Sequence, residues 1–456
     1  MRKRERFKRI INFFEGFVIL AIHVIIFACV WYGDYVEQLE IPFFRRGDWA
    51  VIGIYGLILF LLTNLYGGFQ IGYLRLMDVL YSQILSLVCA NIVVYFQIVL
   101  ISRKYLSSLP LVRMSFYQLA AILLWVFLCK RIYAALYPPK QMLLICYNHS
   151  PEDMLVKVSA RRDKYEICDI ADLRDEPIES VCNMVADYEA VLIYDIPADE
   201  RNTILKRCFT ESVRTYVTPK ISDILLRGSD NIHLFDTPLY LSRNKGLSGD
   251  QIIFKRLLDL VICIPVSIIL MPMFLIIALI IKLTDHGPVL YKQPRLTIDG
   301  NVFYIYKFRS MYTNSEENGA QLAKKNDDRV TPIGKILRGL HFDEFPQLIN
   351  IIKGDMSLVG PRPERPEIAE QYKEVIPEFD FRLKVKAGLT GYAQVYGKYN
   401  TTPYDKLKLD LTYIENYSLW LDIKLLLLTF KILFQKENTE GIDLNQTTAI
   451  KNNKDE

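Results

Sequence analysis

Two adjacent carboxylates, Asp343 and Glu344, stand in an apolar stretch of the chain between Arg338 and Arg362. Adjacent acids repel one another, so a pair in apolar company usually holds a cation, shares a proton, or does both. Arginine suits phosphate, because its planar guanidinium binds two phosphate oxygens at once. The alternative is a helix N-terminus, where the macrodipole stabilises acidic side chains. The pair alone does not decide between these interpretations.

Basic residues recur near the loops around this pair. One such residue would be a solvated surface charge, whereas several that converge on two carboxylates would form a pyrophosphate site, if folding brings them together. The chain contains no Walker glycine loop, no GxSxG elbow and no HExxH motif. The basic candidates are Arg295, Lys307, Arg309, Arg329, Arg338, Arg362 and Arg382.

Two apolar segments flank the candidate site. Residues 260–281 form a run of 22 residues without a charge, which is long enough to cross a membrane. Pro265 and Pro272 would kink a helix there, and basic residues stand at both ends of the run. These features favour a re-entrant helix at about 257–282 over a fifth span. The second segment, residues 419–434, is short for a span and suits an interfacial helix, with a buried core helix as the alternative.

Strands are predicted on both sides of the apolar run. Residues 289–292 and 302–306 read as two strands that are joined through the turn dipeptide Asp299-Gly300. Residues 142–146 and 190–194 read as short buried strands between helix-like stretches. Such alternation predicts a small Rossmann-like α/β domain with a parallel sheet. No phosphate-binding glycines follow its first strand, so we interpret this domain as structural or regulatory rather than nucleotide-binding.

The N-terminal part of the chain is predicted to be embedded in a membrane. Apolar runs at residues 10–31, 50–66, 79–101 and 116–136 each approach the ~20 residues that cross the hydrocarbon core. Basic residues before the first run predict a cytoplasmic N-terminus, and four crossings return the chain to the cytoplasm. The hydrophobic share of 51% and the mean hydropathy of +0.15 agree with a membrane protein.

Composition also excludes several classes of protein. The net charge of +4, without a basic and aromatic stripe, gives no reason to expect nucleic acid as a partner. The 8 cysteines are scattered without a CxxC pair, and with the 5 histidines they give no zinc template and no disulfide framework. Reduced thiols in a protein that faces the cytosol are the simplest account.

A series of short motifs follows the apolar run and the candidate site in order. They are Lys255-Arg256-x-x-Asp259, Gly287-Pro288, Gln293-x-Arg295, Lys307-Phe-Arg-Ser-Met311, Arg329-Val-Thr331, Leu337-Arg338, Asp343-Glu-x-Pro-Gln-Leu348, Lys353-Gly-Asp-Met-Ser-Leu-Val-Gly-Pro-Arg-Pro363 and Gly388-Leu-Thr-Gly391 with Gln394. By these motifs, residues 254–435 resemble the catalytic module of the bacterial sugar transferases, also called polyprenyl-phosphate glycosyl-1-phosphate transferases or monotopic phosphoglycosyl transferases. Four N-terminal spans and an α/β insert resemble the larger members, which start exopolysaccharide, capsule or O-antigen repeats.

The resemblance implies a reaction and a set of roles. A sugar-1-phosphate would pass from a UDP-sugar to undecaprenyl (polyprenyl) phosphate, and UMP would be released. Asp343 would be the nucleophile that forms an acyl-phosphate intermediate, and Asp343 with Glu344 would hold Mg²⁺, or alternatively Mn²⁺. The implied phosphate-binding residues are Arg338, Arg362, Lys307, Arg309 and Arg295. The implied supporting residues are Pro361, Pro363, Gln347, Lys255, Arg256 and Pro272.

The sequence departs from the family pattern in three places. Thr297 stands where a glycine is usual, Leu340-His341 replaces a usual Thr-Ser, and Ala387 replaces a proline. None of these changes removes a charged catalytic group, so they bear on sugar preference more than on activity. Two rival functions stay open, namely a glycosyltransferase that releases UDP and a catalytically silent regulatory membrane protein.

The predicted fold class is therefore membrane-helical combined with α/β. We expect a four-helix transmembrane domain at 1–137, the α/β domain at 138–245, an α+β catalytic domain at 250–435 and a polar, disordered tail at 436–456. The expected location is the bacterial inner membrane, with the catalytic domain on the cytoplasmic side and the lipid bilayer as a partner. A homodimer is one alternative for the assembly.

Overall fold

The computed structural model describes residues 7–44, 46–242, 246–285, 287–312, 329–398 and 401–433. Contacts between residues divide the chain into two compact units, Met1–Pro219 and Lys220–Glu456. The polar tail, and most of the basic cluster at the N-terminus, lie outside the described residues. The described cysteines, which include all eight of the chain, are free thiols, as the scattered spacing predicts.

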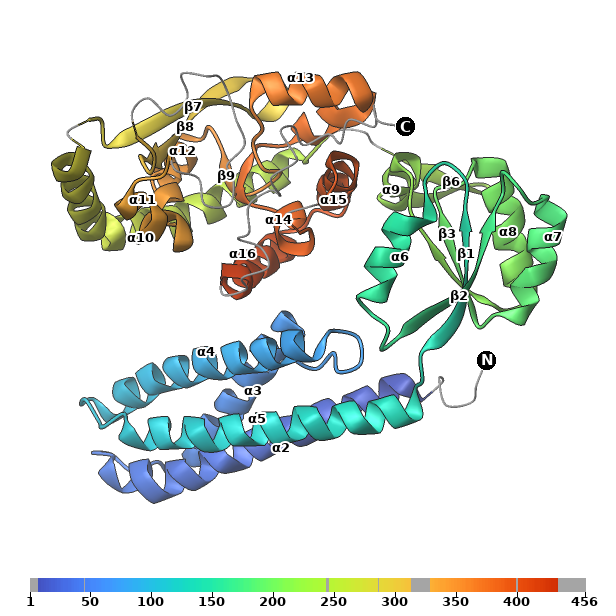
Figure 1. Cartoon of the computed structure of the whole chain (residues 1–456). Coiled ribbons are helices and arrows are strands. Elements are labelled where there is room, and N and C mark those ends of the chain that lie inside the picture. The colour runs from blue at the N-terminus through green and yellow to red at the C-terminus, as the bar shows by residue number, and fades with distance from the viewer. Residues whose placement is uncertain are drawn as a thin grey trace. The chain divides into compact units, whose positions relative to one another are not determined.

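The first unit begins with four apolar helices, which confirm the four predicted segments (Figure 1). Each is long and apolar enough to cross a membrane. A buried amide and hydroxyl network joins three of them. Gln118 Nε2 donates to Tyr55 Oη at 2.7 Å, and Asn91 Nδ2 donates to Gln118 Oε1 at 3.1 Å. The helices are α2 (Lys8–Val30), which continues into η1 (Trp31–Tyr35) and η2 (Val36–Gln38), α3 (Gly47–Tyr66), α4 (Leu76–Ser102) and α5 (Leu109–Leu136).

The first unit continues as a four-stranded sheet in which all strands are parallel, as predicted. Alternate residues of the first strand face opposite layers: Leu143 and Ile145 pack toward α7 and α8, and Met142 and Leu144 pack toward α6 (Figure 1). The strand order is β2-β1-β3-β4. The elements are β1 (Lys140–Cys146), α6 (Pro151–Ser159), β2 (Tyr165–Asp172), α7 (Ile178–Met184), η3 (Val185–Asp187), β3 (Ala190–Tyr194), α8 (Ala198–Thr210) and β4 (Arg214–Val217).

The second unit starts before the residue at which the sequence places the catalytic domain. Helix α9 (Ile221–Arg227) and the antiparallel hairpin β5 (Asp230–Leu234) and β6 (Thr237–Leu241) belong to it. Ile221 and Ile224 of α9 enter the same hydrophobic core as Leu407 and Leu411 further along the chain. The contacts of α9 therefore assign it to this unit.

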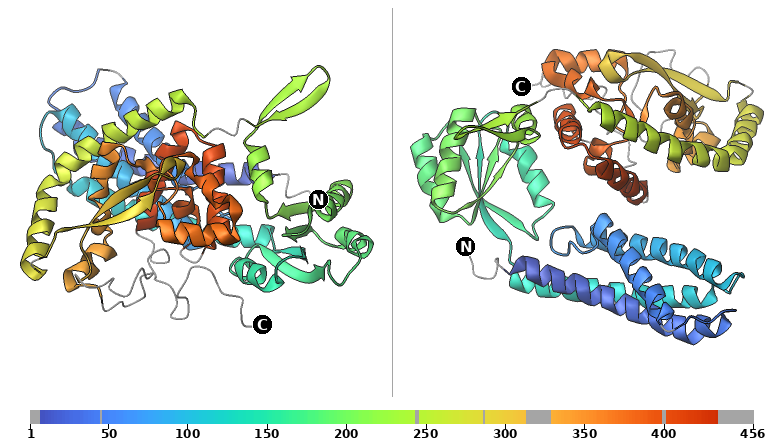
Figure 2. Two further views of the ribbon diagram at one scale, coloured as in Figure 1. Left: turned by 90° about the horizontal axis from the view of Figure 1, so that it is seen from above. Right: turned by 180° about the vertical axis from the view of Figure 1, so that it is seen from behind.

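A long apolar helix, α10 (Gly249–Asp285), follows and is longer than the predicted re-entrant segment. It is continuous through Pro265 and Pro272, and it too is long and apolar enough to cross a membrane. Figure 2 shows that it is bent into two arms, as an internal proline removes a backbone hydrogen bond and kinks a helix. The two arms leave most of their apolar side chains exposed.

The remaining elements of the second unit surround the candidate site. The predicted hairpin is confirmed as antiparallel, and its turn places Asp299 and Gly300 in the left-handed region, at φ 57° and 75°. The elements are β7 (Leu290–Leu296), η4 (Ile298–Gly300), β8 (Val302–Phe308), α11 (Pro332–Gly339), η5 (Phe342–Glu344), α12 (Gln347–Lys353), β9 (Ser357–Val359), α13 (Pro366–Val375), η6 (Pro377–Lys384), β10 (Gly388–Thr390), α14 (Tyr392–Tyr396), α15 (Pro403–Glu415) and α16 (Leu419–Leu433).

Helix α16 presents one face to the core and another outward. Leu425 and Asp422 are buried, whereas Trp420 and Phe430 are exposed. Asp422 accepts a hydrogen bond from Lys255 Nζ at 2.6 Å and another from the Tyr413 hydroxyl at 2.7 Å. The charged residue inside this apolar helix thus anchors α10 to α16.

Removing this anchor should destabilise the second unit. Both side chains of the Lys255–Asp422 pair are almost fully buried, so Lys255→Met leaves a buried charge without its partner. We expect a loss of about 3–5 kcal/mol in the free energy of unfolding, measured by thermal or denaturant unfolding in detergent. The double variant Lys255→Met with Asp422→Leu should recover most of this loss. Lys373→Gln, which breaks an exposed pair with Asp380, should cost no more than about 1 kcal/mol.

Candidate active site

The carboxylate pair lies on a single 3-10 turn, η5, between two aromatic side chains. Phe342 and Phe345 flank the pair in the sequence, and their ring centroids are 5.0 Å apart. The ring centroid of Phe345 also lies 6.2 Å from that of Phe274 in α10. His341, just before the turn, adopts a left-handed conformation with φ 57°. Such a φ is uncommon outside glycine and is often found near functional sites. Helix α10 and the aromatic cluster therefore fix the turn that carries the pair.

Glu344 is held by two cations from different parts of the chain. Lys307 at the end of β8 places Nζ 2.7 Å from Oε1 of Glu344, and Arg362 Nη2 lies 3.2 Å from the same oxygen. These residues are 37 and 18 positions away along the chain. The expected convergence of basic side chains on the carboxylate pair is therefore present for these two.

The two carboxyl groups differ in their affinity for a proton. Burial raises the pKa of Asp343 above its usual value, and neighbouring Glu344 raises it further, against the charges of Lys307 and Arg338. Burial would also raise the pKa of Glu344, but Lys307 and Arg362 outweigh it and hold that pKa well below its usual range. When their environments shift the pKa values of two adjacent acids in opposite directions, the two acids suit different chemical tasks.

Arg338 and Arg309 belong to, or directly follow, two elements that contact the turn, α11 and β8. Arg338, in the last turn of α11, donates from Nε to the Ser310 hydroxyl at 2.9 Å, and its charge acts on Asp343. Arg309 follows β8 directly and is buried. A Cβ on Gly287 would overlap the Arg309 guanidinium, so a larger residue there would require this side chain to shift. Of these two arginines, Arg338 has the clearer electrostatic link to the pair.

Arg295 supports the loop that carries Arg362. It donates from Nη1 to the Pro363 carbonyl at 2.9 Å and from Nη2 to Gln293 Oε1 at 2.6 Å. Burial lowers its pKa to about 10. The structure thus places Arg295 behind the Pro361-Arg362-Pro363 loop, with both of these hydrogen bonds directed to protein oxygens.

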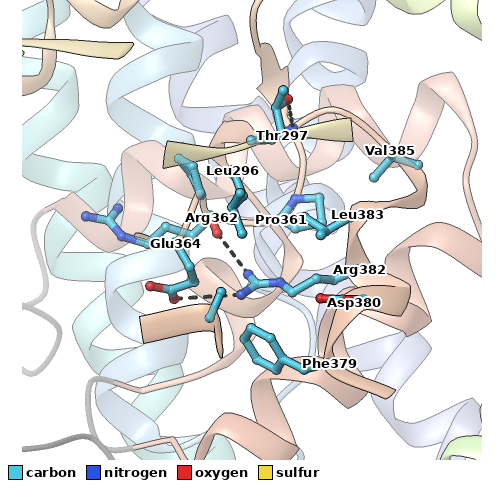
Figure 3. A pocket seen from close by; sticks show the side chains of 13 residues that line it. Leu296, Thr297, Pro361, Arg362, Glu364, Phe379, Asp380, Arg382, Leu383 and Val385 are labelled. Atoms are coloured by element: carbon cyan, nitrogen blue, oxygen red, sulfur yellow. Dashed lines mark hydrogen bonds and ion pairs between the residues drawn. The ribbon is translucent and has the colours of Figure 1, made fainter. Parts of the chain in front are cut away.

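Beneath the same loop lies a small, largely apolar pocket (Figure 3). Arg382 points into it and donates from Nη2 to the Arg362 carbonyl at 2.9 Å. The Arg362 guanidinium extends away from the pocket in this view. The lining residues are Leu296, Thr297, Pro361, Arg362, Pro363, Glu364, Ala369, Phe379, Asp380, Arg382, Leu383, Val385 and Ala387.

The predicted supporting residues on α10 anchor the module. Arg256 donates to the carbonyls of Ile351 at 2.5 Å and Ile352 at 2.6 Å, at the C-terminal end of α12. Lys255 makes the pair with Asp422 described above. Pro272 lies two residues before Phe274, and Phe274 belongs to the aromatic cluster beside the turn.

One buried polar residue near the site, Asn350, carried no assigned role in the sequence. Asn350, which is fully buried, accepts from the Tyr306 amide at 3.0 Å and donates to the Tyr304 carbonyl at 2.8 Å, so it joins α12 to β8. Gln347, one of the implied supporting residues, is buried and begins the same helix. In the sequence, the one indication of a structural role for Asn350 is that it is a polar residue between isoleucines in α12.

The carboxylate pair offers part of a ligand set for a metal ion, which phosphate groups would have to complete. Within the described ranges, no group of three or more His, Cys, Asp and Glu side chains could hold a metal by itself. Mg²⁺ commonly uses one or two carboxylates and takes its other ligands from phosphates and water. Asp343 and Glu344 supply that donor set, although Oε1 of Glu344 already accepts from Lys307 and Arg362.

Fold and site together define a membrane protein whose α+β module gathers cations and two unlike carboxylates, a site suited to phosphate groups. A model of the bacterial sugar transferase family matches residues 250–436. The chain also aligns with a UDP-glucose:undecaprenyl-phosphate glucose-1-phosphate transferase of Caulobacter vibrioides, 40% identical over 189 residues, which cover 40% of this chain and 71% of that relative. The chain belongs to the bacterial sugar transferase family.

Two further relatives carry the likeness across different sugars. A UDP-N-acetylgalactosamine-undecaprenyl-phosphate N-acetylgalactosaminephosphotransferase of Aeromonas hydrophila is 38% identical over 260 residues, which cover 54% of this chain and 59% of the relative. A UDP-glucose:undecaprenyl-phosphate glucose-1-phosphate transferase of Klebsiella pneumoniae is 39% identical over 209 residues, covering 45% and 43%. The chain thus spans about half the length of these two relatives.

The opposite pKa shifts of the pair predict opposite effects on stability. The folded pKa of Asp343 is raised, so its contribution to stability is present below the unfolded pKa and is lost as the pH rises through the folded value. Asp343→Asn should therefore raise the unfolding temperature at pH 8 and change it little at pH 4.

Glu344 has a depressed pKa, so its contribution is present above the unfolded pKa and is lost only in acid. Glu344→Gln should lower stability at pH 8 by about 1.5–3 kcal/mol, because charged hydrogen bonds are removed. Thermal unfolding of both variants between pH 4 and pH 8 measures this contrast. Equal shifts of the same sign would contradict the assignment of distinct environments.

Proposed function

We propose that this protein transfers a sugar-1-phosphate from a UDP-sugar to undecaprenyl (polyprenyl) phosphate, releases UMP, and so starts the assembly of a cell-surface polysaccharide. It is then a polyprenyl-phosphate glycosyl-1-phosphate transferase. The observation that carries the proposal is the buried Asp343 beside an ionised Glu344 that two cations hold. The activities of the relatives, which are undecaprenyl-phosphate sugar-phosphate transferases by name, support the reaction class.

Asp343 acts as the nucleophile in this mechanism. Its carboxylate oxygen attacks the sugar-proximal phosphorus, a phosphorus–oxygen bond forms, and the bond to the bridging oxygen breaks so that UMP leaves with both electrons. The acceptor phosphate then attacks the same phosphorus and restores the Asp343 carboxylate. Covalent catalysis of this kind splits one displacement between two anions into two easier steps.

The cations around the pair stabilise the charge that develops on the phosphoryl oxygens. Arg338, Arg362 and Lys307 are the nearest candidates, and Glu344 keeps Lys307 and Arg362 in place. Asp343 and Glu344 would hold Mg²⁺, or Mn²⁺, which would neutralise further phosphoryl charge. Asp343 must lose its proton to react, so its raised pKa implies that activity falls in acid.

The acceptor is a lipid, so the site should lie at a membrane surface. The bent helix α10 supports a re-entrant arrangement, because both of its arms expose apolar side chains and basic residues flank the apolar run. The outward face of α16, with Trp420 and Phe430, supports an interfacial position for that helix. The catalytic module then stays on the cytoplasmic side of the bacterial inner membrane, where nucleotide sugars are made.

The reaction is tested by the identity of the released nucleotide. Purified membranes with undecaprenyl phosphate, Mg²⁺ and a panel of UDP-sugars should release UMP with one donor, and Asp343→Asn should reduce this release by at least about 10³-fold. Asp299→Asn makes the same chemical change in an exposed turn whose left-handed φ suits asparagine, so it should keep wild-type activity. Release of UDP would establish a plain glycosyltransferase, and silence with every donor would favour a regulatory protein.

The topology of α10 is tested by labelling from one side. Ser248→Cys and Thr284→Cys place thiols at exposed positions before the helix and near its end. In a background without the native cysteines, both should react with a membrane-impermeant maleimide in inverted vesicles and neither in right-side-out vesicles. Labelling of the two thiols from opposite sides would establish α10 as a fifth span instead.

A further inference from the structure

Arg382 occupies a position that sequence alone does not distinguish from those of the phosphate-binding candidates. It lies in η6 and is 4% exposed. Figure 3 shows its guanidinium between the Arg362 carbonyl, 2.9 Å from Nη2, and Glu364, whose Oε1 lies 3.7 Å from Nη1. Asp410 Oδ2 forms an ion pair with the same Nη2 at 2.8 Å. A side chain so buried, with its charge beside two carboxylates, is not available to a substrate phosphate.

The orientation of the Arg362 carbonyl depends on its hydrogen bond with Arg382. Pro361 and Pro363 fix φ on both sides, and the peptide bond that begins at this carbonyl has no N–H, because its nitrogen belongs to Pro363. The hydrogen bond from Arg382 therefore sets the plane of that peptide. The orientation of this peptide plane in turn sets the direction in which the half-exposed Arg362 side chain leaves the backbone. Its Nη2 lies 3.2 Å from Glu344 Oε1.

A second arginine, which is partly buried, holds the next carbonyl of the same loop. Arg295 donates to the Pro363 carbonyl at 2.9 Å, so two guanidinium groups fix two consecutive carbonyls. Asp410 completes the arrangement from α15, because its Oδ2 lies 2.8 Å from Arg382 Nη2 and its side chain is itself 1% exposed. Burial raises the pKa of Asp410 to about 6, so its charge is costly to keep there even beside Arg382.

We propose that Arg382 and Asp410 are positioning residues for the phosphoryl transfer, and that they act through the backbone of Arg362 to aim its guanidinium at the carboxylate pair. This inference rests on the proposed function, since it concerns how the same site is held. A misplacement of a catalytic group by about 1 Å commonly costs about 10²-fold in rate. The fork geometry is the requirement, because a lysine ammonium offers no planar pair of donors.

The main test variant is Arg382→Lys, which keeps the positive charge beside Asp410 but loses the fork. We expect kcat for UMP release to fall by about 10²-fold, with a much smaller change in KM for the UDP-sugar. Asp410→Asn should give a fall of the same kind. Lys373→Gln breaks an exposed pair between α13 and η6, the element that carries Arg382, and should leave activity unchanged.

A double-mutant cycle separates positioning from loss of structure. In an Arg362→Ala background there is no guanidinium to aim, so Arg382→Lys should lower kcat by less than about 3-fold further. A full 10²-fold fall in that background would overturn the proposal, because the effect would then not pass through Arg362. Wild-type kcat in Arg382→Lys would also overturn it. If Arg382→Lys does not fold, Asp410→Asn takes its place in the same cycle.

The wild-type and Asp343→Asn enzymes are measured alongside. No UMP from the wild-type protein with any donor would refute the proposed function itself. UMP release that depends on Asp343 but shows no coupling between positions 362 and 382 would refute only the positioning role.

Discussion

Two carboxylates side by side in a mostly buried turn cannot both stay ionised unless cations lie close to them, and this requirement organises the whole second unit. Lys307 and Arg362 reach Glu344 from a strand and from a distant loop. Asp343 shares the turn but receives less compensation, so its proton is held more tightly. The difference between neighbouring acids is therefore a property of the fold and not of the two residues.

The same requirement explains why so many buried polar contacts converge on the backbone around the site. A cation can act on the carboxylate pair only if its side chain points toward the pair. The backbone that carries a long side chain sets the direction in which it points. Arg295 and Arg382 fix carbonyls of the Arg362 loop, and Asn350 joins α12 to β8, the strand that carries Lys307. These groups lie behind the reacting atoms and hold those atoms' neighbours in place.

The elements of the fold could be predicted from the sequence because their signals are local. Uncharged runs, strand-length apolar segments and the Asp299-Gly300 turn each depend on neighbours within a few residues, and the structure confirms them. The division of labour among the arginines could not be predicted in the same way. Arg362 and Arg382 are equally basic in the sequence, and only long-range packing makes one a half-exposed ligand of Glu344 and the other a buried anchor.

Packing also relates two departures from the family pattern that look independent in the sequence. The Thr297 hydroxyl donates to the Asp355 carbonyl at 3.0 Å and accepts from the Ala387 amide at 3.2 Å. Glycine at 297 has no hydroxyl, and proline at 387 has no N–H, so this bond exists only when both positions differ from the usual residues. Each change therefore supplies the partner that the other needs, and a buried donor is satisfied beneath the Arg362 loop. Positions 297 and 387 show how the backbone beneath the Arg362 loop can be supported by different contacts while the charged groups around the carboxylate pair stay the same.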